Sequence, residues 1–340
     1  MKVNPWRSSS IKIALEGRSF IDIKRIHIDD FDEANDFLNS YGFDMDDPND
    51  RSELFDLKQE AQLLIEEELL KPSEKIPDKI LDISDVRQLL LDASQPRLRQ
   101  HAQWCGGLLK VIHTLAHSYS YLNDVYHRAI REQILQRFQP HIKETANGVE
   151  LGDVELVKFE MRPEKTRRSV AMKLLHKAEN VSADIFDWIG IRFITKSKAQ
   201  VLDVLAYLRN HYLIAYANLK PSRTRNTLLD LDWLKMQTRA GHSIEQIKQT
   251  IESQPYPSLA TAASDNPFSS IAYHSIQFTC RQRIKIEQSS QSLRFFFPFE
   301  IQIMDKVSYD NVRQGLASHA AYKERQRQLI RQRVLAFLDK

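Results

Sequence analysis

The chain has 340 residues, a length that suggests about two domains, and its 42% hydrophobic and 27% charged residues are ordinary for a globular protein. It contains no apolar run of the roughly 18 residues that a membrane span needs, and residues 1–10 lack a secretory pattern. We therefore expect a cytoplasmic protein with no membrane partner. Two cysteines, Cys105 and Cys280, exclude a disulfide framework, and the chain has neither of the common glycine-rich nucleotide-binding loops.

The charge of the chain is unevenly distributed. Residues 1–100 have a balance of −8, whereas the residues after them have a balance of +11. This division predicts two functionally distinct parts, of which the second faces an anionic partner. A solvated basic surface with no such partner is the alternative.

The first half of the chain reads as mostly helical. Residues 20–28 alternate like a strand, and residues 29–34 resemble a helix start because carboxylates occupy the first turn. Further helices are predicted over residues 53–70, 83–91, 104–121 and 126–138. The turn signal Asn147-Gly148 then marks the predicted end of a helical N-terminal region, residues 1–147, whose role is unknown.

Strands and helices mix in the second half. Strands are predicted over residues 154–161, 188–195, 273–280 and 295–303, and helices over residues 164–177, 198–211, 243–253 and 308–338. This order predicts an α+β fold with a mixed sheet flanked by helices over residues 148–340.

A basic stripe follows the first of these strands. If a helix covers residues 164–177, one face of it carries Lys165, Ser169, Lys173 and Lys177. Arg162, Arg167 and Arg168 crowd its start, where free backbone amides favour anions. Stacked lysines around a hydroxyl would hold a triphosphate, and a solvated basic face is the alternative.

Two acids lie within otherwise apolar strand segments. Asp187 opens the segment before Trp188, and Glu300 lies between Phe299 and Ile301. Because a lone buried carboxylate is costly, the two acids predict a Mg²⁺ site on neighbouring strands. Ion pairs with Arg192 or Arg294 are the alternative.

Two further groups are candidates for binding a substrate. Tyr273 could stack on a base, although a structural tyrosine is the commoner case. His319, Tyr322 and Lys323 lie three to four residues apart, so they would share one face of the final helix. That face would either contact phosphates or be solvated.

The order of these segments resembles RelA/SpoT-type alarmone synthetases. Six segments match motifs of that family in the same order over about residues 155–325: Arg162-Pro163-Glu164-Lys165 with Ser169-Val170-Ala171-Met172-Lys173, Asp187-Trp188-Ile189-Gly190-Ile191-Arg192, Asn218-Leu219-Lys220-Pro221, Tyr273-His274-Ser275-Ile276, Glu300-Ile301-Gln302-Ile303, and His319-Ala320-Ala321-Tyr322-Lys323.

The resemblance implies a nucleotidyltransferase-like fold that transfers pyrophosphate from ATP to the 3′-hydroxyl of GDP or GTP. It assigns the ATP phosphates to Arg162, Lys165, Ser169 and Lys173, and Mg²⁺ to Asp187, with Glu300 sharing the metal or taking the proton of the attacking hydroxyl. Tyr273 would stack on the acceptor base, and acceptor phosphates would bind Lys220, His319 and Lys323.

Departures from the family pattern concern mainly the acceptor side. Ala272, Gln277 and Met304 replace the family's glycine, histidine and arginine, and residues 222–270 form an insertion. The acceptor therefore stays open between a guanosine nucleotide, an adenosine nucleotide and the 3′ end of a tRNA. A relative that binds nucleotide or RNA without catalysis is a further alternative.

The resemblance does not extend to the first 145 residues. His113 and His117 are four residues apart, but neither is followed by aspartate, as the hydrolase half of the long relatives would require. We therefore expect no alarmone hydrolysis.

Overall fold

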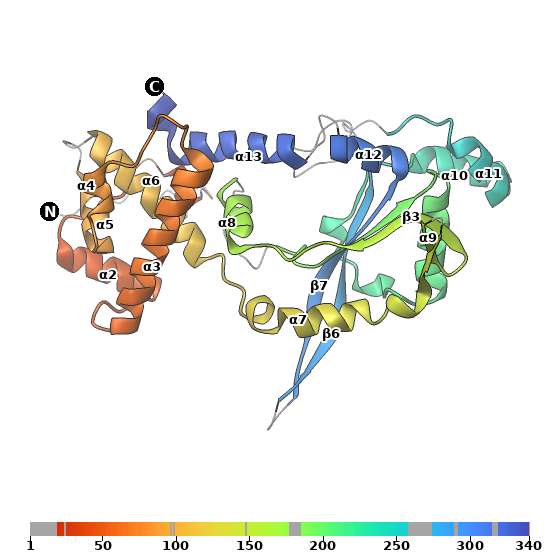
Figure 1. Cartoon of the computed structure of the whole chain (residues 1–340), viewed down its shortest axis with the longest axis horizontal. Helices are drawn as coiled ribbons and strands as arrows, with labels where there is room; N and C mark the ends of the chain where they lie inside the picture. Colours follow the sequence, from red (N-terminus) through yellow and green to blue (C-terminus); the bar gives the residue numbers. More distant parts are fainter. Residues whose placement is uncertain are drawn as a thin grey trace. The chain divides into compact units, whose positions relative to one another are not determined.

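A computed structural model of the chain describes residues 19–23, 25–95, 97, 99–146, 148–176, 185–257, 274–288, 292–314 and 319–339, except for the side chains of residues 314 and 319–321. The chain forms two compact units (Figure 1). Unit 1 is drawn from residues 1–119, 166–184 and 324–340, and unit 2 from residues 120–165 and 185–323. The chain therefore passes between the units four times.

Unit 1 is helical in its described part. Its helices are α2 (Phe31–Tyr41), α3 (Pro48–Leu64), α4 (Asp78–Leu81), α5 (Val86–Ser94), α6 (Arg99–Ala116), α8 (Arg167–His176) and all but the first five residues of α13 (His319–Val334). The predicted start of α2 is confirmed, because the Asp30 carboxylate accepts a hydrogen bond from the Glu33 amide at 2.9 Å. Gly42, at a φ of +107°, ends this helix in the left-handed conformation.

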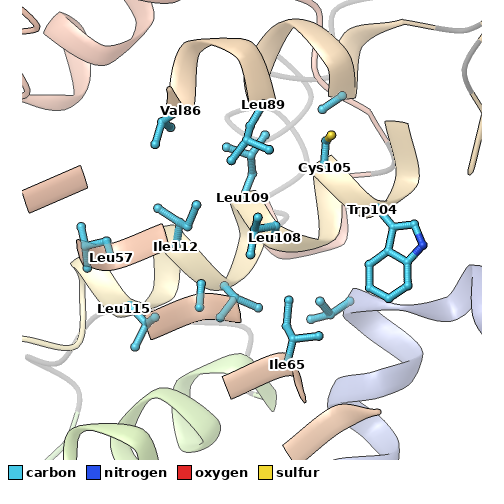
Figure 2. Close-up of a cluster of buried hydrophobic side chains, with 14 of the residues drawn as sticks. Leu57, Ile65, Val86, Leu89, Trp104, Cys105, Leu108, Leu109, Ile112 and Leu115 are labelled. Carbon is cyan, nitrogen blue, oxygen red and sulfur yellow. The ribbon is translucent and has the colours of Figure 1, made fainter. Parts of the chain in front are cut away.

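The core of unit 1 is built around α6. Leu108 and Leu115 of this helix pack with Leu57, Ile65 and Leu89 (Figure 2), and each of these side chains is at most 2% exposed. Side chains from distant parts of the chain complete the same core: Ala171, Met172 and Leu175 from α8, and Ile330, Val334 and Leu335 from the C-terminal end. The N-terminal helices therefore do not form this core alone.

Both cysteines are buried thiols, as expected for small apolar residues. Cys105 belongs to the core of unit 1, Cys280 lies in a strand of unit 2, and both are free. Burial raises the pKa of each thiol to about 12.

Unit 2 contains a mixed sheet, and the predicted α+β class is confirmed. Its described strands follow the order β1-β2-β3-β4-β7-β6-β5. They are β1 (Ile142–Thr145), β2 (Gly148–Leu151), β3 (Val154–Met161), β4 (Gly190–Thr195), β5 (Arg225–Asn226), β6 (Ile276–Glu287) and β7 (Ser292–Asp305). Only the β4–β7 pair is parallel among them, and it aligns Gly190 with Glu300. The helices of unit 2 are α7 (Tyr121–Leu135), α9 (Gln200–Asn210), α10 (Leu231–Arg239), α11 (Ile244–Ile251) and α12 (Lys306–Gln314).

Both faces of the sheet carry apolar packing. On one face, the Phe138 ring that follows α7 contacts the rings of Phe193 and Phe299 at centroid distances of 6.2 Å and 6.4 Å. On the other face, Ile194 and Met304 pack against Tyr309 of α12. Since side chains alternate along a strand, Glu300 shares the second face with Met304.

Some predictions of local structure are wrong. Phe20–Asp22 form a short 3-10 helix, and residues 23 and 25–28 are irregular, because Ile21 and Ile28 are buried in the helical core and not in a sheet. The final stretch, predicted as a helix to residue 338, is helical in its described residues 308–314 and 319–334, but α13 ends at Val334 and a 3-10 turn, Ala336–Asp339, follows. Strands β1, β2 and β5 were not expected, and β1 and β2 are paired on either side of the Asn147-Gly148 signal.

No helix in the part of the chain that the structure describes combines the length and apolar character needed to cross a bilayer.

Candidate active site

A single row of residues crosses the sheet of unit 2. The Arg162 amide donates to the Gly190 carbonyl at 2.8 Å, and Gly190 is paired with Glu300. Glu300 is paired in turn with Thr279, whose carbonyl accepts a hydrogen bond from the Lys220 amide at 3.0 Å. The row therefore brings together three residues that were predicted separately from the sequence: Arg162, Glu300 and Lys220.

The adjacent row is polar on the same face. Arg192 donates to Gln302 through Nε at 2.5 Å and to Glu160 through Nη1 at 2.7 Å. Salt-bridging Arg192 and Lys158 hold the pKa of the Glu160 carboxyl below its usual value, although burial alone would raise it. Arg192 is therefore engaged by Gln302 and Glu160, and the arginine that pairs with Asp187 and Glu300 is Arg162.

Four charged side chains form a compact cluster at the end of this face. Arg162 Nη2 lies 2.5 Å from Glu300 Oε2 and 3.9 Å from Asp187 Oδ2. Lys165 Nζ lies 2.5 Å from the same Asp187 oxygen. The four side chains are only 17–26% exposed, so their interactions are weakly screened by solvent. One guanidinium therefore links the two predicted metal carboxylates, while Lys165 neutralises one of them.

Gly190 makes this geometry feasible. A Cβ atom at this position would overlap the Arg162 guanidinium, which therefore crosses above the bare glycine backbone to reach Glu300. From the sequence, Gly190 was recognised only as part of a motif and had no role of its own. A glycine inside a strand is itself a signal of close approach, and that signal could have indicated the role.

Aromatic contacts connect Lys220 to Asp187. Lys220 Nζ lies 3.7 Å from the centroid of the Phe186 ring, and the Arg223 guanidinium carbon lies 5.2 Å from it. Phe186 immediately precedes Asp187. The ring thus binds two cations at the residue next to Asp187 in the chain, and neither Phe186 nor Arg223 was predicted as a site residue.

The predicted lysine stripe does not form as one helical face. Helix α8 begins at Arg167, and the Ser169 amide donates to Thr166 Oγ1 at 3.2 Å, so Lys165 precedes the helix. The reason is local, because Thr166 caps the helix and Pro163 favours extended chain before it. Ser169 is exposed and Lys173 is half-buried on α8, which belongs to unit 1, whereas Lys165 belongs to unit 2.

The basic start of α8 has acidic partners within unit 1. Arg167 lies 3.0 Å from Glu60, and Arg168 pairs with Glu67. These two arginines are therefore partly neutralised by α3 and by the π-helical turn that follows it.

The remaining predicted acceptor residues are only partly described. Tyr273 lies outside the described residues, and so does the side chain of His319 at the start of α13. Lys323 is exposed on α13. Next to Tyr273, His274 is held between the Thr227 carbonyl at 2.8 Å and the Tyr256 ring, which stacks on it at a centroid distance of 4.0 Å.

The described part of the insertion is packed against the rest of unit 2. The predicted helix over residues 243–253 is confirmed as α11, which begins with a capping box formed by Ser243 and Gln246. Ile247 and Ile251 are buried, and Lys198 donates to the Gln254 carbonyl at 2.6 Å. This part of the insertion is therefore a packed helix and not a long mobile loop.

The donor set fits a magnesium ion. Asp187 and Glu300 supply hard carboxylate oxygens, both within 4 Å of one guanidinium nitrogen. Magnesium is usually held by one or two carboxylates together with substrate phosphates. The same cluster contains the two cations that would meet those phosphates.

No family model matches the chain, and no curated protein matches it. Solved structures similar to it include small alarmone synthetase 2 from Bacillus subtilis, at 12% identity over 64% of this chain and 92% of that one, with a TM-score of 0.28. A GTP pyrophosphokinase family protein from Streptococcus pneumoniae is similar at 13% identity over 68% and 87% of the two chains, with a TM-score of 0.26. Both are named for the class of enzyme that the motifs resemble. At these TM-scores the superposition is slight.

Proposed function

We propose that this chain is an ATP-dependent pyrophosphokinase that transfers pyrophosphate from ATP to the 3′-hydroxyl of GDP or GTP in the cytoplasm. The observation that carries the proposal is the cluster in which Arg162 links the carboxylates of Asp187 and Glu300 while Lys165 pairs with Asp187. Transfer of a phosphoryl-type group needs positioned cations, a metal and an aligned nucleophile, and little covalent help from the protein.

On the donor side, the ATP phosphates would replace the carboxylates of the cluster as partners of its two cations. Arg162 and Lys165 neutralise the carboxylates in the described state, and they would turn to the ATP phosphates when the nucleotide binds. Magnesium held by Asp187 and Glu300 would neutralise phosphate charge and acidify a nearby hydroxyl. Ser169 and Lys173 on α8 would add further contacts to the phosphates.

At the reacting centre, the acceptor 3′-oxygen forms a bond to the β-phosphorus of ATP. The bond between the β-phosphorus and the oxygen that bridges it to the α-phosphorus breaks, and AMP leaves with that electron pair. Glu300 takes the hydroxyl proton, since it lies in the centre of the row between the donor cation Arg162 and the acceptor cation Lys220. Tyr273 would stack on the acceptor base, and His319 and Lys323 would join Lys220 in holding acceptor phosphates.

A second acceptor, the 3′ end of a tRNA, is favoured by the β6–β7 hairpin. Its register extends to Glu287 and Ser292, well past the residues of β7 that pair with β4, and Figure 1 shows it projecting from the sheet. One face of this ribbon carries Arg281, Arg283, Lys285 and Arg294 around Phe296, which is 56% exposed. Cations around an exposed aromatic ring suit single-stranded nucleic acid.

The deciding experiment incubates the purified chain with Mg²⁺, γ-labelled ATP and one acceptor at a time: GDP, GTP, AMP or bulk tRNA. We expect label in a guanosine nucleotide and equimolar release of AMP. Label in tRNA alone would replace the acceptor by the second candidate, and label in AMP would indicate an adenosine acceptor. The absence of transfer to all four, with ATP still bound, would leave the non-catalytic binder as the correct function.

A further inference from the structure

Unit 1 contains a cavity whose described lining includes none of the residues proposed for the active site. Its volume is about 700 Å³, and its described walls are residues 20–23, 25 and 26, residues 93 and 95, one side of α6, and residues 332–334, 336 and 337 near the C-terminus. This volume lies within the range of roughly 300–1,000 Å³ that is typical of small-molecule sites.

The wall of the cavity is strongly basic. The charged residues among the described lining are Asp22, Arg25, Arg99, Lys110 and Arg333. Asp22 is already engaged, because Arg333 Nε and Nη2 each donate to its carboxylate at 2.9 Å. The described lining therefore has three more cations than carboxylates, and an anion in the cavity would offset that charge.

Two of these cations are held by backbone carbonyls. Lys110 Nζ donates to the Arg333 carbonyl at 3.1 Å, and Arg25 donates to the Ser94 carbonyl. Arg25 Nε is buried with no hydrogen-bond partner among the described residues. Burial, with the Arg333 charge, lowers the pKa of Lys110 to about 8, although Asp22 raises it. A neutral carbonyl accepts a hydrogen bond but does not balance the charge of Arg25 or Lys110. Both side chains can therefore still donate to an anionic ligand.

The uncharged part of the wall includes two aromatic rings and leaves room on α6. Phe20 is fixed against His113 at a ring distance of 4.8 Å, and Phe337 is fixed against Trp104 at 5.2 Å. A Cβ atom on Gly106 would meet nothing within 4 Å, so this glycine leaves open space in the lining of the cavity. Fixed aromatic walls beside an open volume suit a flat apolar group.

We propose that this cavity binds a small phosphate monoester with an apolar or aromatic body. The dianionic phosphate matches the surplus of cations better than a single carboxylate does, and the body would lie between Phe20, Phe337 and Gly106. The phosphate would accept hydrogen bonds from Arg25 and Lys110.

Equilibrium dialysis of the full chain against fluorescent 1-naphthyl phosphate tests this inference, with inorganic phosphate and 1-naphthol as probes of the two halves of the ligand. We expect saturable binding of the ester that is at least about ten-fold tighter than the binding of either half. Gly106→Leu, which fills open space, should abolish the binding, whereas the matched Gly106→Ala should retain it. Lys110→Met should weaken it about ten-fold or more.

Two controls separate this cavity from the candidate active site and from misfolding. Lys165→Ala should leave the affinity for 1-naphthyl phosphate unchanged, and Arg25→Gln provides a second test of the basic wall if Lys110→Met melts early. The absence of binding to the wild-type chain up to about 1 mM would overturn the inference. Equal affinity of the wild type, Gly106→Leu and Arg25→Gln would overturn it as well.

Discussion

Gly190→Ala is the sharpest perturbation of the proposed active site, because it adds one methyl group at the centre of the row. The added Cβ would overlap the Arg162 guanidinium and push it away from Glu300. Gly190 is not among the glycines with positive φ, so the strand itself accepts alanine. The substitution should therefore displace the Arg162 guanidinium and leave the fold of unit 2 unchanged.

The size of the effect follows from the contact that is lost. Arg162 and Glu300 are 26% and 18% exposed and meet at 2.5 Å. A hydrogen bond between charged groups of this kind contributes about 1.5–3 kcal/mol. If the same guanidinium holds a phosphate in the transition state, kcat/KM for pyrophosphate transfer should fall about 10- to 150-fold.

A double-mutant cycle with Arg162→Ala provides the measurement. Gly190→Ala should cost activity in the wild-type background and almost nothing when Arg162 is already absent, because both changes remove the same contact. Gly106→Ala is the matched control, since its added methyl meets open space in unit 1. Full activity of Gly190→Ala, or additive losses in the double variant, would refute the reasoning.

Asp187→Asn and Glu300→Gln should each reduce transfer to background with unchanged circular dichroism, because each removes a charge and little volume; near-normal turnover in Mg²⁺ would contradict the carboxylate pair. Phe186→Leu removes the ring beneath the Lys220 ammonium, a contact of about 0.5–2 kcal/mol, and should raise the acceptor KM about 2- to 30-fold with ATP affinity unchanged. An equal loss of affinity for ATP and for the acceptor would show that Lys220 does not act on the acceptor alone. Burial lowers the pKa of His113 to about 4, so below pH 6.5 the unfolded chain takes up a proton that the folded chain does not. The free energy of unfolding should therefore fall by about 2 kcal/mol more between pH 7.5 and pH 5 in the wild type than in His113→Phe, as measured by denaturation at each pH. Parallel pH profiles would show that this histidine is not the titrating group.

The sequence was most informative where a residue type contradicted its surroundings. A carboxylate at Glu300 inside an apolar strand and another at Asp187 indicated a polar site, and the structure places both beside the same guanidinium. Alternation along β7 then determines which face Glu300 occupies. Strand β3, predicted over residues 154–161, has these limits in the structure, although its pairing with β4 shifts register between Leu156 and Lys158.

Features set by distant contacts could not be predicted in the same way. Residues 20–28 alternate like a strand, yet Ile21 and Ile28 are buried against helices that their own sequence does not reveal. The spacing of Lys165 and Ser169 suggested one helical face, whereas the chain passes from unit 2 to unit 1 directly after Lys165. Periodicity reports local geometry and carries no information on which unit a segment joins.

The core of unit 1 has a consequence for how the protein is made. Translation delivers α5 and α6 early, but the last apolar side chains of their core, Ile330, Val334 and Leu335, emerge only after all of unit 2. At about 5–20 residues per second, the face that they cover stays open on the ribosome for tens of seconds. During that interval the nascent chain offers apolar surface to chaperones and to other nascent chains. A stop codon just before Ile330 would make the opening permanent, although every residue of the proposed active site would already have been synthesised.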